Sequence, residues 1–454
     1  MRIENSLIVF LIDPNFSRTI ASPATSRARV NACFSEGHTF SFLYRSKLDM
    51  FEIMASFSRA FRSLAQYCYT RLMPNSPTVR QMVTDLVATP SMSSTLAQFD
   101  LSNEGVVNLL ANWLDRLGFK VSTKPIPGLP GKKNLIATVG QGIKGLVLSG
   151  HTDTVPLDEH FWRSDPFKIK EVDNRWYGLG TSDMKSFFAL VIDAMAPLMN
   201  QHFKHPLVIL ATADEESGMS GIRALQDEDL RNSKYAVIGE PTSLTPIHLH
   251  KGMMMLRADI HGQSGHSSNP ELGSNALNAS ANLINELVEF GSYLKTEFTD
   301  QRFDVFYPTL NLGCIHGGNN PNRICDHVSI SMDVRTLPGM DNQDVLKKLR
   351  YRIEELNASP DLTSNLELIH NPIAPFENDG SELLGTLQDL TKNTAHSVAF
   401  ATEAPFLKDL GIETIVLGPG SIDQAHQPNE YIDLNQLEPT VAIIRALVGK
   451  YCLN

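Results

Sequence analysis

The chain has 454 residues, of which 42% are hydrophobic and 20% are charged. This length and composition suffice for two domains with substantial cores and exclude a disordered or fibrous protein. The formal net charge of −11 at pH 7 disfavours nucleic acid as a partner, because phosphate binding requires a basic surface that releases counterions. A soluble enzyme that acts on small molecules fits these values better.

The five cysteines are scattered, odd in number and include no CxxC pair. They predict neither a disulfide framework nor a thiolate zinc site, and they favour a reducing, cytoplasmic location. The longest apolar stretch near the N-terminus, SLIVFLI, is too short to span a bilayer and has no small-residue cleavage site close behind it. We therefore expect no membrane anchor and no secretion.

Residues 1–74 form an N-terminal extension that is rich in Ser, Arg and Phe and shows no sustained period. A transit-like presequence is one interpretation, although Asp13, Glu36 and Asp49 weaken it. Genuine folded structure is another, and the third is a start codon assigned too early, with the candidate starts Met50, Met54 and Met73. We predict an extension that is poorly ordered or not native.

After the extension, apolar periodicity predicts two helices. The first covers Val79 to Val87 and stops before Thr89-Pro90. The second covers Val106 to Leu117, with Ser102 or Asn103 as its N-cap. Gly118, just past its end, is typical of a helix C-terminus.

Strands and helices then alternate along the chain. This alternation favours an α/β fold, a mainly parallel sheet with helices on both faces. A helix is predicted at 187–199, and strands are predicted at 135–139, 146–149, 207–213, 236–239 and 414–417.

A different order of elements occupies residues 251–370. Strand, helix, strand, strand, helix and strand follow one another there, which is the ferredoxin-like α+β pattern. Because strands of the first type recur at Thr414, we expect 251–370 to be inserted into a catalytic domain formed by 75–250 and 371–454.

Five potential metal ligands lie in short, separated motifs, each just past an apolar run. In an open α/β sheet, functional groups gather outside the carboxyl ends of the strands. Two imidazoles and three carboxylates suit zinc or cobalt, so the motifs predict a hydrolase with two metal ions. The ligands are His151 in GHTDTVP, Asp183 in GTSDMK, Glu216 in ADEES, Glu240 in IGEPT and His426 in QAHQPNEY.

His151 follows the apolar run LVLSG, so one neutral ring nitrogen can bind a metal at the strand end. The carboxylate of Asp153 lies where it could accept the other ring N–H and fix the tautomer. An ordinary pair of a histidine and an aspartate is the alternative.

Asp183 lies between a predicted strand at 175–177 and the helix that follows, and its two oxygens could bridge two ions. The alternatives are a helix cap and a phosphate loop. The phosphate loop is disfavoured because Gly178 and Gly180 do not have the spacing of the known glycine-rich motifs.

Three adjacent acids, Asp214, Glu215 and Glu216, end the apolar run LVILATA. Their mutual repulsion requires an offset, which a dication would supply. Neighbouring side chains diverge, so Glu216 can bind metal while Glu215 serves as general base. A solvated acidic turn is the alternative.

On these motifs the chain resembles the M20 family of metallopeptidases and aminoacylases from Val79 to Asn454. The resemblance extends to KGMMMLRADIHGQSGHSSNPELGSNAL, GGNNPNRICDHVSISMDVRTLPG, TEAPF and LGPGSIDQAHQPNEY. It implies a cis peptide between Asp183 and Met184. It also implies that Asp183 bridges, that Glu215 is the acid/base group and that Asp153 orients His151. The implied ion sites are His151, Asp183 and Glu240 for one ion and Asp183, Glu216 and His426 for the other.

The resemblance further implies that the inserted domain is a lid and dimerisation surface of a homodimer. His266, in SGHSS, matches a family histidine that can stabilise the oxyanion, in some relatives from the partner subunit; the alternative is a solvent-exposed histidine. Asn322 and Arg335 are candidates for binding the substrate carboxylate, with Arg323 as a rival.

The expected activity is hydrolysis of a small N-acylated amino acid with two zinc or cobalt ions. Another acyl-amino-acid hydrolase or dipeptidase of the same family is the nearest alternative. A metal-binding homologue without catalysis is a further one, which the presence of Glu215 beside all five ligands disfavours.

Overall fold

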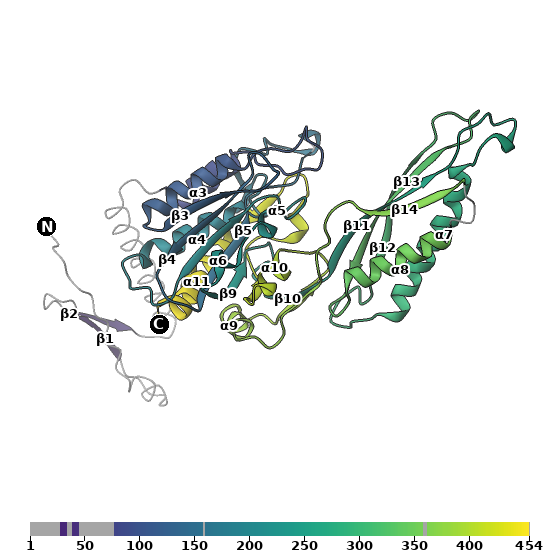
Figure 1. The fold of residues 1–454 in the computed structure, drawn as a ribbon. Helices are drawn as coiled ribbons and strands as arrows, with labels where there is room; N and C mark the ends of the chain where they lie inside the picture. The colour runs from purple at the N-terminus through teal and green to yellow at the C-terminus, as the bar shows by residue number, and fades with distance from the viewer. Residues whose placement is uncertain (1–27, 34–38, 45–76, 158, 357–360, 454) are drawn as a thin grey trace. The chain divides into compact units, whose positions relative to one another are not determined.

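The structure is a computed structural model that describes residues 28–33, 39–44, 77–157, 159–356 and 361–453. The chain divides into two compact units, residues 1–76 and 77–454. In the first unit, β1 (Ala28–Cys33) and β2 (Thr39–Tyr44) form an antiparallel pair (Figure 1). These strands lie within the extension for which we predicted little order, and the rest of that extension lies outside the described residues.

The second unit begins with the two predicted helices, α2 (Val79–Val87) and α3 (Glu104–Arg116). The hydroxyl of Thr78 caps α2 by accepting a hydrogen bond from the main-chain N–H of Gln81 at 3.2 Å. Asn103 stands at the N-cap of α3, but its side chain bonds to the main chain of Lys133 and does not cap the helix. The apolar stripes of both helices are buried.

Nine strands of the second unit form a large sheet in the order β15, β10, β17, β9, β5, β8, β4, β3, and β16 pairs with β10. Its four central strands, β17, β9, β5 and β8, are parallel, while antiparallel pairs flank them on both sides. The sheet is therefore mixed, whereas we predicted a mainly parallel one. The strands are β3 (Lys120–Pro125), β4 (Lys133–Val139), β5 (Gly145–His151), β8 (Leu207–Thr212), β9 (Ser233–Ile238), β10 (Ile247–His250), β15 (Phe376–Glu377), β16 (His396–Val398) and β17 (Glu413–Val416).

Helices cover both faces of this sheet (Figure 1). Strand β8 shows why, since Leu207 and Ile209 pack into one core while Val208 and Leu210 pack into another. The first core contains α2, α3, α4 (Lys185–Met195), α9 (Glu382–Thr391) and α11 (Leu437–Val448). The second contains α5 (Ser220–Arg223), α6 (Asp227–Leu230) and α10 (Ala404–Asp409).

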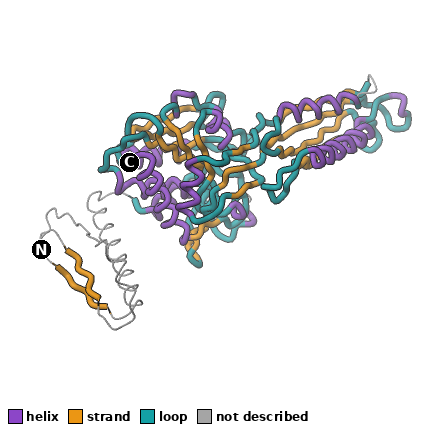
Figure 2. The backbone as a smooth tube through the Cα atoms, turned by 90° about the horizontal axis from the view of Figure 1, so that it is seen from below, coloured by secondary structure: helices purple, strands orange, loops and turns teal. Residues whose placement is uncertain are grey.

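A second, four-stranded sheet has the antiparallel order β12, β13, β11, β14, with two helices packed on one face (Figure 2). Alternate residues of β13, such as Val328 and Ile330, point into the core shared with the helices. The predicted order of elements is present: β11 (Gly252–His261), α7 (Ala276–Glu297), β12 (Thr309–Gly317), β13 (His327–Thr336), α8 (Asn342–Glu355) and β14 (Thr363–Leu368).

A small three-stranded sheet brings together two segments that are distant in the sequence. Its order is β18 (Tyr431–Asp433), β7 (Arg175–Tyr177) and β6 (Lys170–Val172). Because β18 pairs with β7, the QPNEY motif lies next to the loop that carries Asp183.

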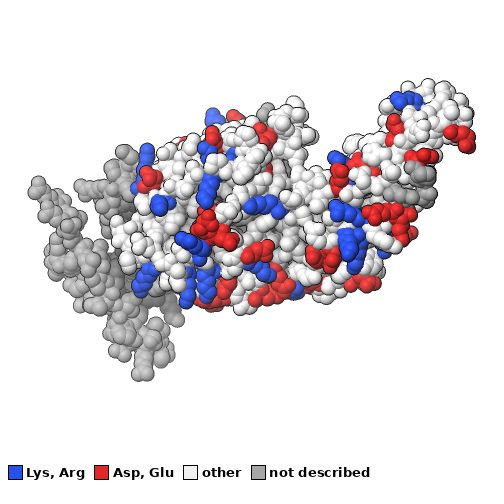
Figure 3. Space-filling view, in the orientation of Figure 1, with Lys and Arg blue, Asp and Glu red and all other residues white. Residues whose placement is uncertain are grey.

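None of the helices in the described ranges has the length and apolar content that a membrane crossing requires. On the face drawn in Figure 3, acidic and basic side chains lie interspersed.

Candidate metal centre

The predicted ligands gather at the carboxyl ends of neighbouring parallel strands. His151 is the last residue of β5, and the acidic turn Asp214 to Glu216 begins two residues after β8 ends. Glu240 follows β9 at the same edge of the sheet. Because β8, β5 and β9 are adjacent and parallel, these side chains meet in one place.

Asp183 presents one carboxylate oxygen to each histidine. Its Oδ1 lies 2.9 Å from Nε2 of His151, and its Oδ2 lies 3.7 Å from Nε2 of His426. His426 Nε2 also lies 2.9 Å from Oε2 of Glu216, and His151 Nε2 lies 3.8 Å from Oε1 of Glu240. Asp183 is therefore central, with a histidine and a glutamate on each side of it.

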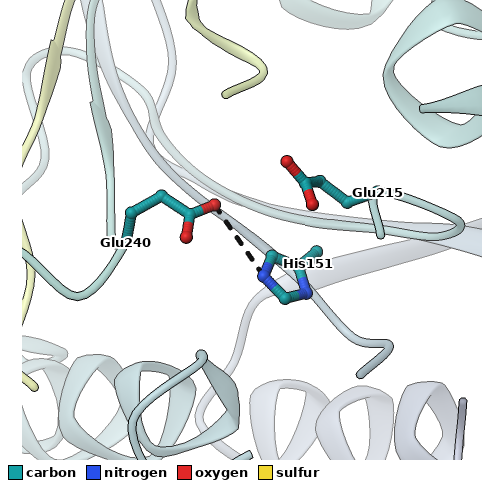
Figure 4. Close-up of side chains that lie close together, drawn as sticks. All are labelled: His151, Glu215 and Glu240. Atoms are coloured by element: carbon teal, nitrogen blue, oxygen red, sulfur yellow. Dashed lines mark ion pairs between the residues drawn. The ribbon is translucent and has the colours of Figure 1, made fainter. Parts of the chain in front are cut away.

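Two overlapping groups of side chains each bring three possible ligand atoms within 4.8 Å of one another. One group is His151, Glu215 and Glu240, which Figure 4 shows converging from different elements. The other is His151, Asp183 and Glu216. Imidazole nitrogens and carboxylate oxygens in this proportion are a donor set that fits divalent zinc or cobalt.

The Asp183 side chain does not cap the following helix, because the N-cap of α4 is Met184 and no side chain caps it. The peptide between Asp183 and Met184 is cis, as the family resemblance implied.

Asp153 acts on His151 differently from the prediction. Nδ1 of His151 lies 3.0 Å from the main-chain oxygen of Asp153, while the nearest carboxylate oxygen is 3.9 Å away. The main-chain carbonyl, and not the carboxylate, thus accepts the ring N–H, and Nε2 is the ring nitrogen that faces Asp183 and a metal. Oδ2 of Asp153 instead accepts the main-chain N–H of Glu216 at 3.1 Å.

The three adjacent acids have separate surroundings. Asp214 has a positive φ of 61°, and its main-chain oxygen accepts the N–H groups of Gly218 and Met219, so it begins a tight turn. Glu215 and Glu216 follow on that turn and point into the site. The turn is therefore not a solvated acidic loop.

Burial and the charge of Glu240 raise the pKa of Glu215 well above its usual range. Burial likewise raises the pKa of Glu240 and, together with the charge of Asp183, that of Glu216. The carboxylates thus repel one another in a medium that screens them poorly. A divalent cation among them would favour their ionised forms.

The two histidines have pKa values raised by their carboxylate partners. Burial lowers the pKa of His151, but the hydrogen bond to Asp183 and the surrounding carboxylates together raise it well above its usual range. The hydrogen bond to Glu216 is the main cause that raises the pKa of His426 to about 9. Both rings thus lie in a field that attracts a cation.

Two buried glutamates near the site were missed from the sequence. Glu403, in TEAPF, is buried, one of its carboxylate oxygens has no hydrogen-bond partner, and burial raises its pKa to about 7. Glu430, in QPNEY, binds the loop that carries Asp183. Both motifs were noted in the sequence, but within QAHQPNEY only His426 was assigned a role. The signal that could have found the two glutamates is an acidic residue between apolar and turn residues.

Of the remaining predicted residues, Arg335 lies on β13, whereas His266, Asn322 and Arg323 lie in loops at the other end of the smaller sheet. His266 bridges to Arg323, and the main-chain oxygen of Asn322 accepts from Ser267. Arg335 lies eight residues beyond His327, roughly 26 Å further along the strand, and donates to Asp333 at 2.8 Å. The structure therefore does not bring Arg335 together with Asn322 and Arg323.

Within the described parts of one chain, no hydrogen bond or ion pair joins these four residues to the candidate ligands. His266 is exposed, and its Nδ1 lies 2.8 Å from the hydroxyl of Ser268.

Imidazoles and carboxylates at the strand ends of a mixed α/β sheet, with one carboxylate between two histidines, define a metal-dependent hydrolase. The chain belongs to peptidase family M20/M25/M40, whose sequence model matches residues 147–450. The predicted family is thereby confirmed.

Relatives of known name match nearly their whole length. Acetylornithine deacetylase of Proteus mirabilis (strain HI4320) is 45% identical over 378 residues, which cover 83% of this chain and 97% of that protein. Acetylornithine deacetylase of Photorhabdus laumondii subsp. laumondii is 44% identical, with 83% and 98% covered.

Solved structures share the fold at low identity. An M20 family metallo-carboxypeptidase, Sso-CP2 from Sulfolobus solfataricus, has a TM-score of 0.66 at 17% identity and covers 83% of this chain and 99% of that chain. The YXEP protein of Bacillus subtilis, described as a dinuclear metal binding peptidase, has a TM-score of 0.56 at 15% identity, with 84% and 98% covered.

Proposed function

We propose that this chain hydrolyses the amide bond of N2-acetyl-L-ornithine to acetate and L-ornithine, a step of arginine biosynthesis. The observation that carries the proposal is the identity of 43% to 45% with acetylornithine deacetylases over 83% of the chain. The metal-ligand cluster at the strand ends supplies the chemistry that such a reaction needs.

Two divalent cations, zinc or cobalt, would occupy the cluster. His151, Asp183 and Glu240 would hold one ion, and Asp183, Glu216 and His426 the other. The contacts of Asp183 support this division, since its two oxygens approach different histidines. When bound, the ions supply a Lewis acid for the acetyl carbonyl and lower the pKa of the attacking water.

Glu215 would transfer the protons. Its carboxylate lies beside His151 and Glu240 (Figure 4). It takes no part in the contacts that link Asp183, Glu216 and His426. From there it can take a proton from the attacking water and deliver it to the departing α-amino group. Asp153 would orient His151 through its main-chain oxygen and hold the acidic turn through its carboxylate.

Residues 251–370 would form a lid and dimerisation domain, next to the catalytic domain of 75–250 and 371–454. The exposed side chain of His266, far along the smaller sheet from its junction with β10, suits a role in the partner's site. His266 would stabilise the oxyanion there. Asn322 and Arg335 were the predicted ligands of the substrate carboxylate, but Arg323, the predicted rival, shares the end of the sheet with Asn322 and would bind the carboxylate with it. Arg335 is the alternative from the same chain.

The face that would mediate dimerisation is formed by α7 and the edge strand β12. Large apolar side chains are exposed there, at Leu277, Val288 and Ile315. Free cysteines, including the exposed Cys314, support a reducing cytoplasm as the location.

The test is an assay of the purified, zinc-loaded or cobalt-loaded protein with acetylornithine and, in parallel, with succinyl-diaminopimelate. Efficient turnover of acetylornithine is expected. A strong preference for the succinylated substrate would make the chain a desuccinylase. Full metal occupancy without hydrolysis of any acylated amino acid would make it a binding protein.

A further inference from the structure

Glu430 is the residue whose contacts exceed what the proposed mechanism uses. It precedes β18, which pairs with β7, and its main-chain oxygen accepts the N–H of Gly178 at 3.0 Å. The side chain is buried, with 2% of its surface exposed. Its carboxylate therefore lies beneath the loop that ends at Asp183.

Three main-chain N–H groups of that loop converge on the Glu430 carboxylate. Gly180 donates to Oε2 at 2.9 Å, while Ser182 and Asp183 donate to Oε1 at 2.7 Å and 3.0 Å. Gly180 has a φ of 82°, a conformation that a glycine adopts easily. The loop thus forms a concave set of donors that a carboxylate fills.

One of these donors belongs to Asp183 itself. The main-chain nitrogen of Asp183 is held from one side by Glu430, while its carboxylate meets His151 and His426 on the other. The contact therefore fixes the backbone from which the central carboxylate of the site projects. A side chain shared by two ions tolerates less rotation than one that serves a single ion.

A second buried side chain, that of Lys185, follows Asp183 in the chain. The Lys185 side chain is almost fully buried, and its Nζ donates to the main-chain oxygens of Thr89 at 2.8 Å and Leu86 at 3.3 Å. Burial lowers the pKa of Lys185 to about 7 and raises the pKa of Glu430 to about 8. Lys185 thus ties the start of α4 to the chain at the end of α2, while Glu430 binds the main-chain N–H groups of the Asp183 loop.

We propose that Glu430 is a positioning residue of the metal centre, which orients the Asp183 carboxylate toward both ions by binding the N–H groups of Gly180, Ser182 and Asp183. The inference rests on the proposed two-ion site but not on the identity of the substrate. Loss of Glu430 should weaken the binding of both ions together, because Asp183 is the residue that the two ions would share.

The experiment uses the full chain and three variants: Glu430→Ala, Glu430→Gln and the control Asn342→Ala. Glutamine keeps one carbonyl acceptor for Ser182 and Asp183 but turns an amide N–H toward the donor of Gly180. Asn342 is also buried, and its side chain bonds to Thr336 and to the main-chain oxygen of Ile373 on another part of the chain. It therefore reports what loss of buried hydrogen bonds does without touching the Asp183 loop.

Zinc affinity is measured by competition with a chromophoric chelator, and the cobalt-loaded forms are compared by their absorption spectra. Glu430→Ala should lower the affinity for both ions by about 10-fold to 100-fold, the usual effect of removing a group that orients a ligand. Glu430→Gln should lie between this variant and wild type, with an altered cobalt spectrum. Asn342→Ala should unfold more easily and keep wild-type affinity.

Wild-type affinity and spectrum in Glu430→Ala would overturn the inference. So would an equal loss of affinity in Asn342→Ala, because the effect would then follow general stability. If Glu430→Ala does not fold, the test depends on Glu430→Gln, and wild-type zinc affinity together with a wild-type cobalt spectrum in that variant would overturn the inference. Failure of wild type to hydrolyse acetylornithine, with Glu430-dependent metal binding intact, would reject the proposed function and leave this inference standing.

Discussion

Glu215 and Glu216 are neighbours in sequence but have different partners in the site. Glu216 lies 2.9 Å from His426, whereas Glu215 groups with His151 and Glu240. Because adjacent side chains diverge on the turn that Asp214 begins, one carboxylate can bind metal while the other stays available for proton transfer. The two residues should therefore fail in different ways when they are changed.

Glu215→Gln keeps the size of the side chain and removes its ability to accept a proton. We expect metal content to stay at the wild-type level and turnover to fall by about 10² to 10⁴, the usual contribution of general acid and base catalysis. Metal analysis and kcat on acetylornithine measure both quantities. Glu216→Gln is the matched control and should lose metal. An unchanged kcat in Glu215→Gln would remove this residue from the role of base.

The candidate ligands could be predicted because each follows an apolar run, and strand ends are where an α/β sheet collects its functional groups. The partners that orient those ligands could not. Glu430 bonds to main-chain N–H groups 247 to 250 residues earlier in the chain, and no local pattern indicates such a contact. Asp153 was predicted as a neighbour of His151, but the choice between its carbonyl and its carboxylate depends on how the chain turns.

Helix α7 carries an apolar stripe on the side that its own core does not cover. Val288 is 55% exposed on α7, and Ile315 is 49% exposed on the adjacent edge strand β12. An edge strand leaves main-chain groups unpaired, so a second copy of the chain could cover both the stripe and the edge.

Val288→Glu places a charge in that surface and should convert a dimer to a monomer, which size-exclusion chromatography with light scattering measures. Activity should fall when the dimer is lost, because His266 could then no longer reach the active site of the partner subunit. Tyr351→Glu is the control, since Tyr351 is 61% exposed on α8, next to β14 and away from the edge strand. A wild-type dimer in Val288→Glu would exclude this face.

The elements of the large sheet were more predictable than their directions. Apolar runs located β4, β5 and β8, but β8 pairs between the other two although it is far from both in the chain. Strand periodicity reports which faces are buried and says nothing about the direction of the neighbouring strand. The antiparallel pairing beside the parallel centre was missed for this reason, whereas the smaller sheet was predicted in order because its pattern recurs as a unit.

The stability of the whole chain should depend on pH through His250. Burial lowers the pKa of this histidine to about 4, its ring stacks on Phe376, and its Nε2 has no hydrogen-bond partner. Between pH 6.5 and 4 the unfolded chain binds a proton that the folded chain does not. The free energy of unfolding should therefore fall as the pH falls through this window, by up to about 3 kcal/mol from His250.

His250→Asn removes this titration, so its free energy of unfolding should fall less steeply from pH 6.5 to pH 4 than that of wild type. Urea unfolding at several pH values measures the slope of the free energy of unfolding against pH for each protein. The buried carboxylates contribute nearly equally to variant and wild type, so their contribution largely cancels in the difference. His202→Asn, at an exposed histidine, should have the wild-type slope. Equal slopes for all three proteins would mean that His250 is protonated in the folded state as readily as in the unfolded one.

Residues 77–454 should suffice for metal binding and catalysis. This compact unit contains every candidate ligand, and the Proteus mirabilis relative matches 378 residues of the chain along 97% of its own length. A chain that starts at Pro77 should keep its zinc affinity and its kcat/KM on acetylornithine. A chain that starts at Thr89 loses α2, whose Met82 and Leu86 are buried in the main core, and also the Leu86 oxygen that binds Lys185. Each lost core side chain costs about 2 to 5 kcal/mol, so this shorter chain should not fold. Loss of metal or activity on removal of residues 1–76 alone would instead make the N-terminal unit part of the working enzyme.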